Sequence, residues 1–264
     1  MLKMISKISA VIALLFFAAV SLQAKDISAY YDAPYANANT VKTKLGKAGF
    51  KVLTTYSPAN KDYLKVIVFT NNKLKSIASK KLRGFAAVQR VIVNSKAKTV
   101  RVTNTEYWLR AFMQKDFKAG SCKDIKASIG KALGQLTATK DVLDSGDLAG
   151  YHYAFSMPYY EDMLEFKAGK TTVDPKKKLF EVKLANGSTL FGVKLSSTEN
   201  FIESIGEDKA LALPYTILLE DGKAHALHAK YYLAVSYPLL TLGQFMKISS
   251  TPDAIERKLK KSLK

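Results

Sequence analysis

Two stretches of this chain align with each other without gaps, and this internal repeat constrains the fold more than any other feature. Residues 87–112 (AVQRVIVNSKAKTVRVTNTEYWLRAF) align with residues 212–237 (ALPYTILLEDGKAHALHAKYYLAVSY) at an offset of 125. An earlier pair, 42–48 and 126–132, aligns at an offset of 84. The difference between the two offsets gives the second copy a net 41 additional residues. A long repeat of this kind predicts a duplicated structural unit.

Each copy shows the same order of predicted elements: a helix, two strands, a second helix and a hairpin. In the first copy, a strand at 27–31 precedes a helix at 40–48, strands at 50–56 and 63–70, a second helix, and a hairpin of 88–93 with 99–102. The second helix starts at Asn71 or Asn72, and its apolar face consists of Leu74, Ile77, Ala78 and Leu82. In the second copy, they are a helix at 124–136, strands at 179–184 and 190–195 joined at Asn186-Gly187, a helix at 199–205 and a hairpin around 220–222, and 231–246 follows as helix or irregular cover.

The repeat predicts an α+β fold of two halves, each an antiparallel sheet with two helices. An approximate two-fold axis would relate the two halves. The predicted divisions are a first repeat at 25–115, a second repeat at 116–250 with an insertion near 137–178, and a basic helix at 251–264. Two separate domains on a linker are the alternative. Residues 114–122 are too short to hold the halves far apart, which favours the side-by-side arrangement.

Residues 1–24 are typical of a secretory signal peptide. Lys3 and Lys7 precede an apolar run at 8–20, and Ala24 is a small residue suited to cleavage; cleavage after Ser21 is an alternative. An uncleaved membrane anchor is the rival interpretation, but this run is shorter than the roughly 20 residues that a spanning helix needs. We therefore expect a soluble protein, exported to the periplasm.

The chain is strongly basic, with a formal net charge of +19. Removal of residues 1–24 takes away two lysines and no acid, which leaves +17. Such a charge favours encounters with anionic partners, which in a bacterial envelope are lipid head groups, acidic polymers and acidic proteins. Export argues against nucleic acid as a partner. The alternative is that the lysines serve only to keep the protein soluble.

Cys122 is the only cysteine, which excludes an internal disulfide and a cysteine metal cluster. We expect it to be a small packing residue on a helix rather than a reactive thiol. The core must therefore provide the stability of the fold.

The run at 66–102 resembles the domain-of-unknown-function 302 family, in which a strand, an asparagine-rich helix start and a helix lead to a strand pair introduced by a proline corner. Residues 213–227 resemble the same corner, with Pro214 present and Tyr215 where the first copy has Arg90. Gln89 takes the proline position in the first copy. The resemblance implies a compact two-layer α+β domain in each half, and it carries no catalytic residues to transfer.

Residues 151–160 (YHYAFSMPYY) have the most unusual composition in the chain. Five aromatic rings, an imidazole and a thioether could line a pocket for a flat or apolar ligand. The alternative is an alternating strand whose rings pack over the core. The predicted ligand-binding residues are Arg90, at the strand-entry corner where a guanidinium could meet an anion, together with His152, Tyr153, Met157, Tyr159 and Tyr160.

No catalytic motif accompanies these residues. Glu161, Asp162 and Glu165 match no hydrolase spacing, and no nucleophile elbow or phosphate-binding glycine loop is present. His225 and His228 would point to opposite faces of a strand, so we predict neither a metal site nor a cofactor.

The sequence thus predicts a non-enzymatic module that binds a small molecule or a partner, with the cleft between its halves and the inserted aromatic segment as the binding site. The alternatives are a protein that binds anionic envelope surfaces and an uncharacterised enzyme. For the anionic surface, the basic helix at 251–264 is the candidate, with Ile255, Leu259 and Leu263 on its apolar stripe. The competing interpretation packs that stripe on the protein's own sheet and leaves the lysines in solvent.

Overall fold

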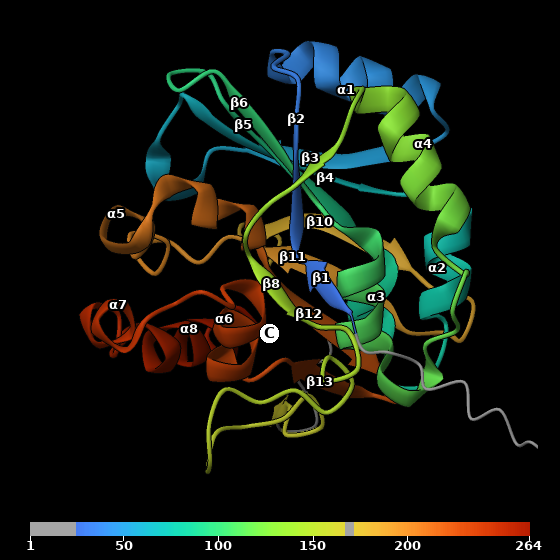
Figure 1. Ribbon diagram of the computed structural model, residues 1–264. Helices are drawn as coiled ribbons and strands as arrows, with labels where there is room; N and C mark the ends of the chain where they lie inside the picture. Colours follow the sequence, from blue (N-terminus) through green and yellow to red (C-terminus); the bar gives the residue numbers. More distant parts are fainter. Residues whose placement is uncertain (1–24, 167–171) are drawn as a thin grey trace, which may run out of the picture.

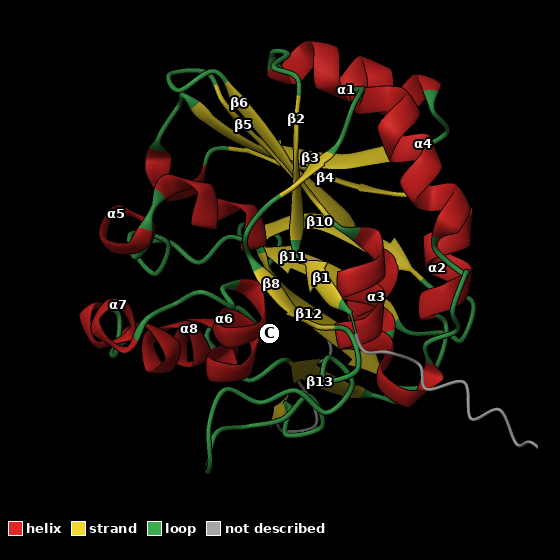
Figure 2. Cartoon of the chain, in the orientation of Figure 1, coloured by secondary structure: helices red, strands yellow, loops and turns green. Residues whose placement is uncertain are grey.

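The computed structural model describes residues 25–166 and 172–264, which fold around two antiparallel β-sheets with helices on their outer sides (Figures 1 and 2). This confirms the predicted α+β class. The predicted signal peptide, residues 1–24, lies outside the described residues. None of the helices described in these two ranges is long and apolar enough to cross a membrane.

The first sheet contains the longest strand of the described chain. Its six strands follow the order β3 (Lys51–Tyr56), β4 (Leu64–Thr70), β5 (Gln89–Asn94), β6 (Thr99–Thr103), β2 (Tyr30–Ala33) and β7 (Thr137–Ala138). Residues 66–69 in β4 are fully buried, because a central strand rich in valine and isoleucine is covered on both faces. The predicted hairpin is confirmed: Asn94 closes its turn by accepting hydrogen bonds from the main-chain N–H groups of Lys96 and Ala97.

Four α-helices accompany this sheet: α1 (Ala38–Lys47), α2 (Asn72–Ala78), α3 (Thr105–Met113) and α4 (Lys123–Leu133). Asn37, Asn71 and Asn104 start α1, α2 and α3, and each side-chain oxygen accepts a hydrogen bond from a main-chain N–H of the first turn. The N-cap predicted at Asn71 is thereby confirmed.

The second sheet has five strands and a similar helical cover. The strands follow the order β10 (Lys178–Lys183), β11 (Thr189–Val193), β12 (Tyr215–Glu220), β13 (Lys223–Ala226) and β9 (Leu164–Phe166), and the helices are α5 (Ile202–Ile205), α6 (Ala229–Ser236), α7 (Leu242–Lys247) and α8 (Thr251–Lys260). A separate pair joins β1 (Asp26–Ser28) to β8 (Val142–Asp144). Each half therefore carries more helices than the two predicted.

The two sheets have the same spatial order of strands when the strands of each are numbered along the chain. The order β3-β4-β5-β6-β2 in the first corresponds to β10-β11-β12-β13-β9 in the second. A 3₁₀ helix precedes the hairpin in both, as η2 (Gly84–Ala87) and η4 (Glu207–Ala212). The contacts are reciprocal, since η4 packs on β5 and β6 while η2 packs on β11 and β12.

Tertiary contacts shorten two of the predicted helices. The first, α2, ends at Ala78, so Leu82 does not extend its apolar face. Leu82 instead has a φ of 56° and donates its main-chain N–H to the carboxylate of Glu220 in the second half. In the second case, α5 starts at Ile202 rather than at Glu199, which is buried and accepts a hydrogen bond from the main chain of Ala59.

Several segments after α3 pack or pair with elements of the N-terminal part of the described chain. The helix α4, whose sequence aligns with α1, packs on α1 and α3. β7 pairs with β2, and β8 pairs with β1. At the other end of the chain, α8 packs against α6, and Ile255, Leu259 and Leu263 are buried. The apolar stripe of the basic helix is therefore covered by the protein itself.

Candidate functional site

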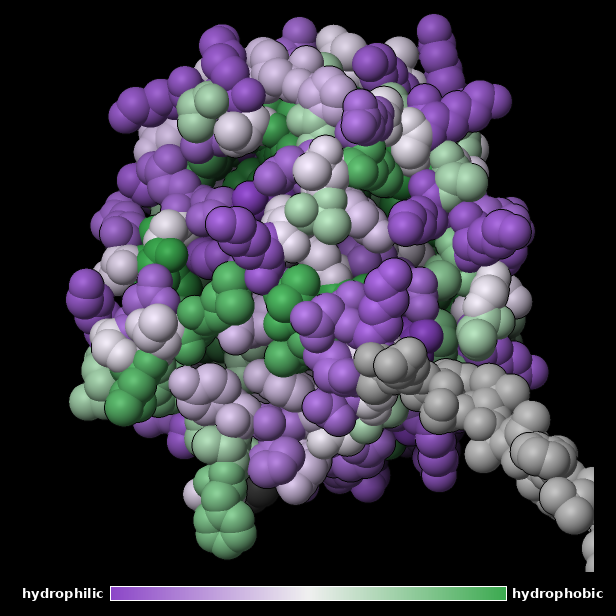
Figure 3. Space-filling view, in the orientation of Figure 1, coloured by the Kyte–Doolittle hydropathy of each residue, from purple (hydrophilic) through white to green (hydrophobic). Residues whose placement is uncertain are grey.

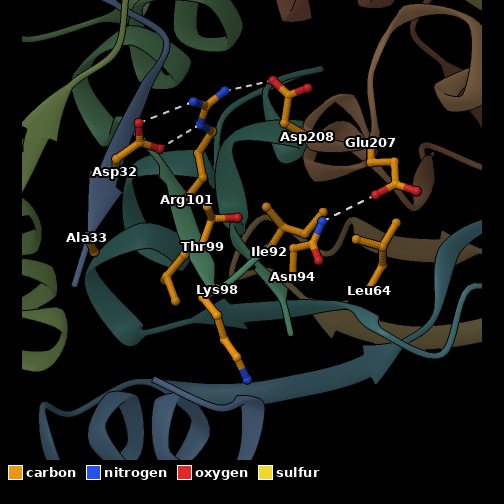
Figure 4. Close-up of a pocket in the computed structure, with 11 residues that line it drawn as sticks. Asp32, Ala33, Leu64, Ile92, Asn94, Lys98, Thr99, Arg101, Glu207 and Asp208 are labelled. Atoms are coloured by element: carbon orange, nitrogen blue, oxygen red, sulfur yellow. Dashed lines mark hydrogen bonds and ion pairs between the residues drawn. The ribbon is translucent and has the colours of Figure 1, made fainter. Parts of the chain in front are cut away.

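Arg101 on β6 organises a cleft between the two halves (Figure 4). Its Nε and Nη2 atoms donate to the two carboxylate oxygens of Asp32 at 2.7 and 3.2 Å. This paired geometry arises because Asp32 is the direct register partner of Arg101 on β2. The Nη1 atom donates to Asp208 on η4 at 2.7 Å, so one guanidinium links both halves.

The cleft has a volume of about 290 Å³, which suits a small ligand. Leu64, Ile92 and Val100 form an apolar floor from the first sheet. The polar lining is Asp32, Asn94, Lys98, Thr99 and Arg101 from the first half, and Glu207 and Asp208 from the second. Since both halves contribute, the cleft exists only in the assembled fold.

The acidic groups of the cleft already have partners. Lys209 lies 3.1 Å from Asp141 and 3.2 Å from Asp208. Glu207 accepts hydrogen bonds from Asn94, at 3.2 Å, and from the hydroxyl of Tyr63. The bond to Glu207 raises the pKa of Tyr63, because it stabilises the protonated phenol beside a carboxylate.

Lys98 is the exception among the charged lining groups. It lies at the opposite end of the cleft from Arg101 (Figure 4), and within residues 25–166 and 172–264 it forms no ion pair. Its ammonium group lies 5.1 Å from the centre of the Tyr35 ring, which is 40% exposed. Lys98 is therefore the charged group of the cleft that a ligand can neutralise.

The predicted residue Arg90 is buried rather than exposed at a corner. It is 3% exposed on β5, and its Nη2 atom donates to the main-chain oxygen of Pro214 at 3.2 Å. Its Nε atom has no partner among the described residues. Arg90 thus joins the halves from inside, and its burial keeps it away from the solvent that an incoming anion would cross.

A buried polar cluster surrounds this arginine, and sequence reasoning missed it. Besides Arg90 Nε, the hydroxyls of Tyr56 and Tyr215 and one oxygen of Glu199 have no hydrogen-bond partner in the described part of the chain. The charges of Glu199 and Arg90 both act on Tyr56. Burial raises the pKa of Glu199 despite the hydrogen bond from Ala59. Only tertiary packing brings these groups together, so no local pattern signals the cluster.

Residues 151–160 form turns and irregular chain, so the alternating strand considered for them is wrong. Tyr160 is a core residue: it is fully buried, donates its hydroxyl to the main chain of Leu82 at 2.6 Å, and meets Phe85 edge-on. Phe155, by contrast, is 96% exposed and lies in the loop between β8 and β9, which projects at the lower edge of Figure 1.

The other predicted residues of this segment divide between two contacts. His152 packs on the ring of Tyr159 with centroids 4.3 Å apart, and Tyr153 stacks on Phe245 of α7 at 6.1 Å. Met157 is partly buried. Among the hydrogen bonds, ion pairs and ring contacts of the described residues, none joins Arg90 to this segment.

The histidines and the cysteine also lie apart. His225 is buried on β13, whereas His228 is the N-cap of α6 and contacts Glu256 at 3.1 Å. Cys122 is buried, and burial raises the pKa of its thiol. In the ranges that the structure describes, no three His, Cys, Asp or Glu side chains lie where they could hold a metal ion.

Three comparisons with known proteins were made for the whole chain. No family model matches it, and neither a curated protein nor a solved structure is significantly similar.

Proposed function

We propose that this protein is an exported, periplasmic, non-enzymatic binding module of two related halves, which takes a small ligand in the cleft around Arg101. The observation that carries the proposal is that η4 of one half closes a cleft on the sheet of the other, through Asp208 and Glu207. Ligand sites commonly form where two such units meet.

The strand order supports the duplication within this proposal. The five shared strands pair in the same order in both sheets, and the 3₁₀ helices make reciprocal contacts. We infer that the second copy begins at β9, since α4, β7 and β8 pack or pair with elements of the first half. The resemblance of both copies to the domain-of-unknown-function 302 family is part of the same proposal.

The arrangement of charges suggests the class of ligand. Lys98 at one end of the cleft can meet an anionic group. Each carboxylate oxygen of Glu207 accepts one hydrogen bond, from Tyr63 or from Asn94, and therefore keeps a lone pair that can receive a cationic group. The apolar floor between them suits a short hydrocarbon portion. We therefore propose a small amphoteric ligand that carries one acidic and one basic group, such as an amino acid or a short peptide.

Thermal unfolding with and without amino acids and dipeptides tests the proposal. A ligand that binds only the folded state raises the midpoint of unfolding, by mass action. The Lys98→Gln variant should lose most of that increase. Lys96→Gln is the matched control, because Lys96 lies in the same turn but over the ring of Tyr63, outside the cleft.

Two results would count against a ligand in this cleft. One is that no amphoteric compound in the set raises the unfolding midpoint of the wild-type protein. The other is that Lys98→Gln and Lys96→Gln respond alike to a compound that does.

A further inference from the structure

Three neighbouring helices carry a local excess of positive charge. α1, α2 and α4 together contain eight lysines and one acid, Asp124. α1 packs on α4, and Lys73 of α2 pairs with Asp124 of α4. Figure 1 shows the three helices along the upper and right edges of the molecule, where Figure 3 shows mainly hydrophilic residues.

A depression lies beside these helices, where the edge strands of the two sheets approach each other. It has a volume of about 340 Å³, and its basic lining residues are Lys51 of β3, Lys75 of α2 and Lys183 of β10. A second depression of about 390 Å³ shares Lys51 and Lys75 and reaches the end of α1 at Gly46. The basic lining therefore continues from the junction of the sheets onto the helices.

The lysines that line this depression differ from the charged groups around Arg101 because no ion pair among the described residues neutralises them. Within the described residues, Lys51, Lys75 and Lys183 take part in no ion pair. Glu181, the acid in the lining, is held by Lys178 at 2.9 Å. Unpaired lysines that converge on a concave surface repel one another, and an anion bound between them relieves that repulsion.

We propose that this lysine surface, which comprises the eight lysines of α1, α2 and α4 with Lys51 and Lys183, docks the protein on a membrane of anionic phospholipids. Lys51, Lys75 and Lys183 take a phosphate head group in the depression, while the lysines of the helices contact the surrounding head groups. The surface extends over three helices, which is wider than one free phosphate can cover. A layer of anionic head groups matches that extent, and each lysine near it adds to the attraction.

The surface is not the one that the sequence suggested. The basic helix α8 also carries exposed cations, but its apolar stripe is buried against the protein and cannot enter a bilayer. Docking through α1, α2 and α4 instead rests on charge, so it requires no apolar insertion. It also leaves the Arg101 cleft, lined by different residues, free to act independently.

Co-sedimentation of the mature protein with vesicles tests this proposal. Binding is expected with vesicles that contain phosphatidylglycerol and not with vesicles of phosphatidylcholine alone, and it should disappear at about 1 M salt, where screening acts over about 3 Å. The variant Lys51→Gln/Lys75→Gln/Lys183→Gln should bind on the order of 100-fold more weakly.

The control variant Arg257→Gln/Lys260→Gln/Lys261→Gln removes the same charge from α8 and its C-cap residue. It should bind within a few-fold of the wild type, and unchanged circular dichroism should show that both variants fold. Equal losses in the two variants would show that net charge alone drives binding, which would overturn the assignment of this surface. Binding that inorganic phosphate at low concentration abolishes would also overturn it, in favour of a site for free phosphate.

Discussion

Tyr107 and Tyr231 each donate a hydroxyl hydrogen bond to the helix that carries the other. Tyr107 on α3 donates to the main-chain oxygen of Val235 on α6 at 2.6 Å, and Tyr231 on α6 donates to that of Ala111 on α3 at 3.1 Å. Tyr107 is 0% exposed and Tyr231 is 1% exposed. The exchange joins the helix that follows the β5–β6 hairpin of the first sheet to the helix that follows the β12–β13 hairpin of the second.

The first prediction concerns these two bonds. Tyr107→Phe and Tyr231→Phe should each lower the free energy of unfolding by about 1–2 kcal/mol, because each leaves a buried carbonyl without that donor. The double variant should lose less free energy of unfolding than the sum of the two single losses, because removal of either bond weakens the contact between α3 and α6 that holds the other bond in place. Urea unfolding measures all three values. Tyr35→Phe is the control: Tyr35 is partly exposed, and a change beyond about 0.5 kcal/mol there would be unexpected.

The second prediction concerns pH and Glu199. Burial raises its pKa in the folded state, so the charged form is disfavoured there. Below the unfolded pKa of about 4.3, the side chain is neutral in both states and its ionisation does not affect stability. As the pH rises from there through the folded pKa, the unfolded chain ionises more readily than the folded one, so the folded state loses stability. Glu199→Gln should therefore stabilise the protein at neutral pH and make no difference in acid.

Unfolding curves recorded from acidic to neutral pH test this dependence. Glu203→Gln is the matched control, because this nearby carboxylate is 55% exposed and pairs with Lys61. A stabilisation by Glu199→Gln that does not change with pH would contradict the role given to its charge.

The third prediction compares two glycines. Gly46 lies inside α1 with open space around the position of a Cβ atom, so Gly46→Ala should stabilise the protein by about 0.5–1 kcal/mol through its helix propensity. Gly192 on β11 faces the ring of Phe180, its register partner on β10. Gly192→Ala should cost about 1–3 kcal/mol, because the ring must move. Thermal unfolding should give opposite signs for the two variants, and equal signs would refute the packing at Gly192.

The fourth prediction separates the two tyrosines at the end of the aromatic segment. Tyr160→Ala should destabilise the protein by about 3–5 kcal/mol, since it empties a core position between Phe85 and Tyr231. Tyr159→Ala should cost less than about 1 kcal/mol, because that ring is 43% exposed. Denaturant unfolding distinguishes them, and a large loss at Tyr159 would show that the segment packs more tightly than its exposure indicates.

Local sequence signals predicted most elements of the fold. Asn71 marks a helix start because its short side chain can accept the first free N–H groups, and Asn186-Gly187 marks a hairpin because both residues tolerate tight turns. These signals act within a few residues. The prediction for Leu82 is wrong, because its main-chain N–H donates to the distant carboxylate of Glu220 and the helix ends before it, although the apolar spacing would continue the helix.

The candidate site was much harder to predict. The strand-entry position of Arg90 predicts contact with an anion, yet the side chain is buried and donates to the main-chain oxygen of Pro214, 124 residues further along the chain. Nothing local in the sequence distinguishes Asp32 and Arg101, because the pairing of β2 with β6 joins segments far apart in the chain. The repeat predicts a cleft between the halves, but the residues predicted to line it, Arg90 with Tyr153, Met157 and Tyr159, are not those that line the Arg101 cleft.

The sequence by itself determined the periodicity of the strands and helices, the caps and turns, and the excess of lysine, because each depends on residue type or short spacing. Only the tertiary structure decided which charges are neutralised. It paired the acids of the Arg101 cleft with basic groups from both halves, and it left Lys51, Lys75 and Lys183 unpaired around a shared depression among the described residues. Pairing depends on distances of a few ångströms between residues far apart in the chain, and the assembled fold alone sets those distances.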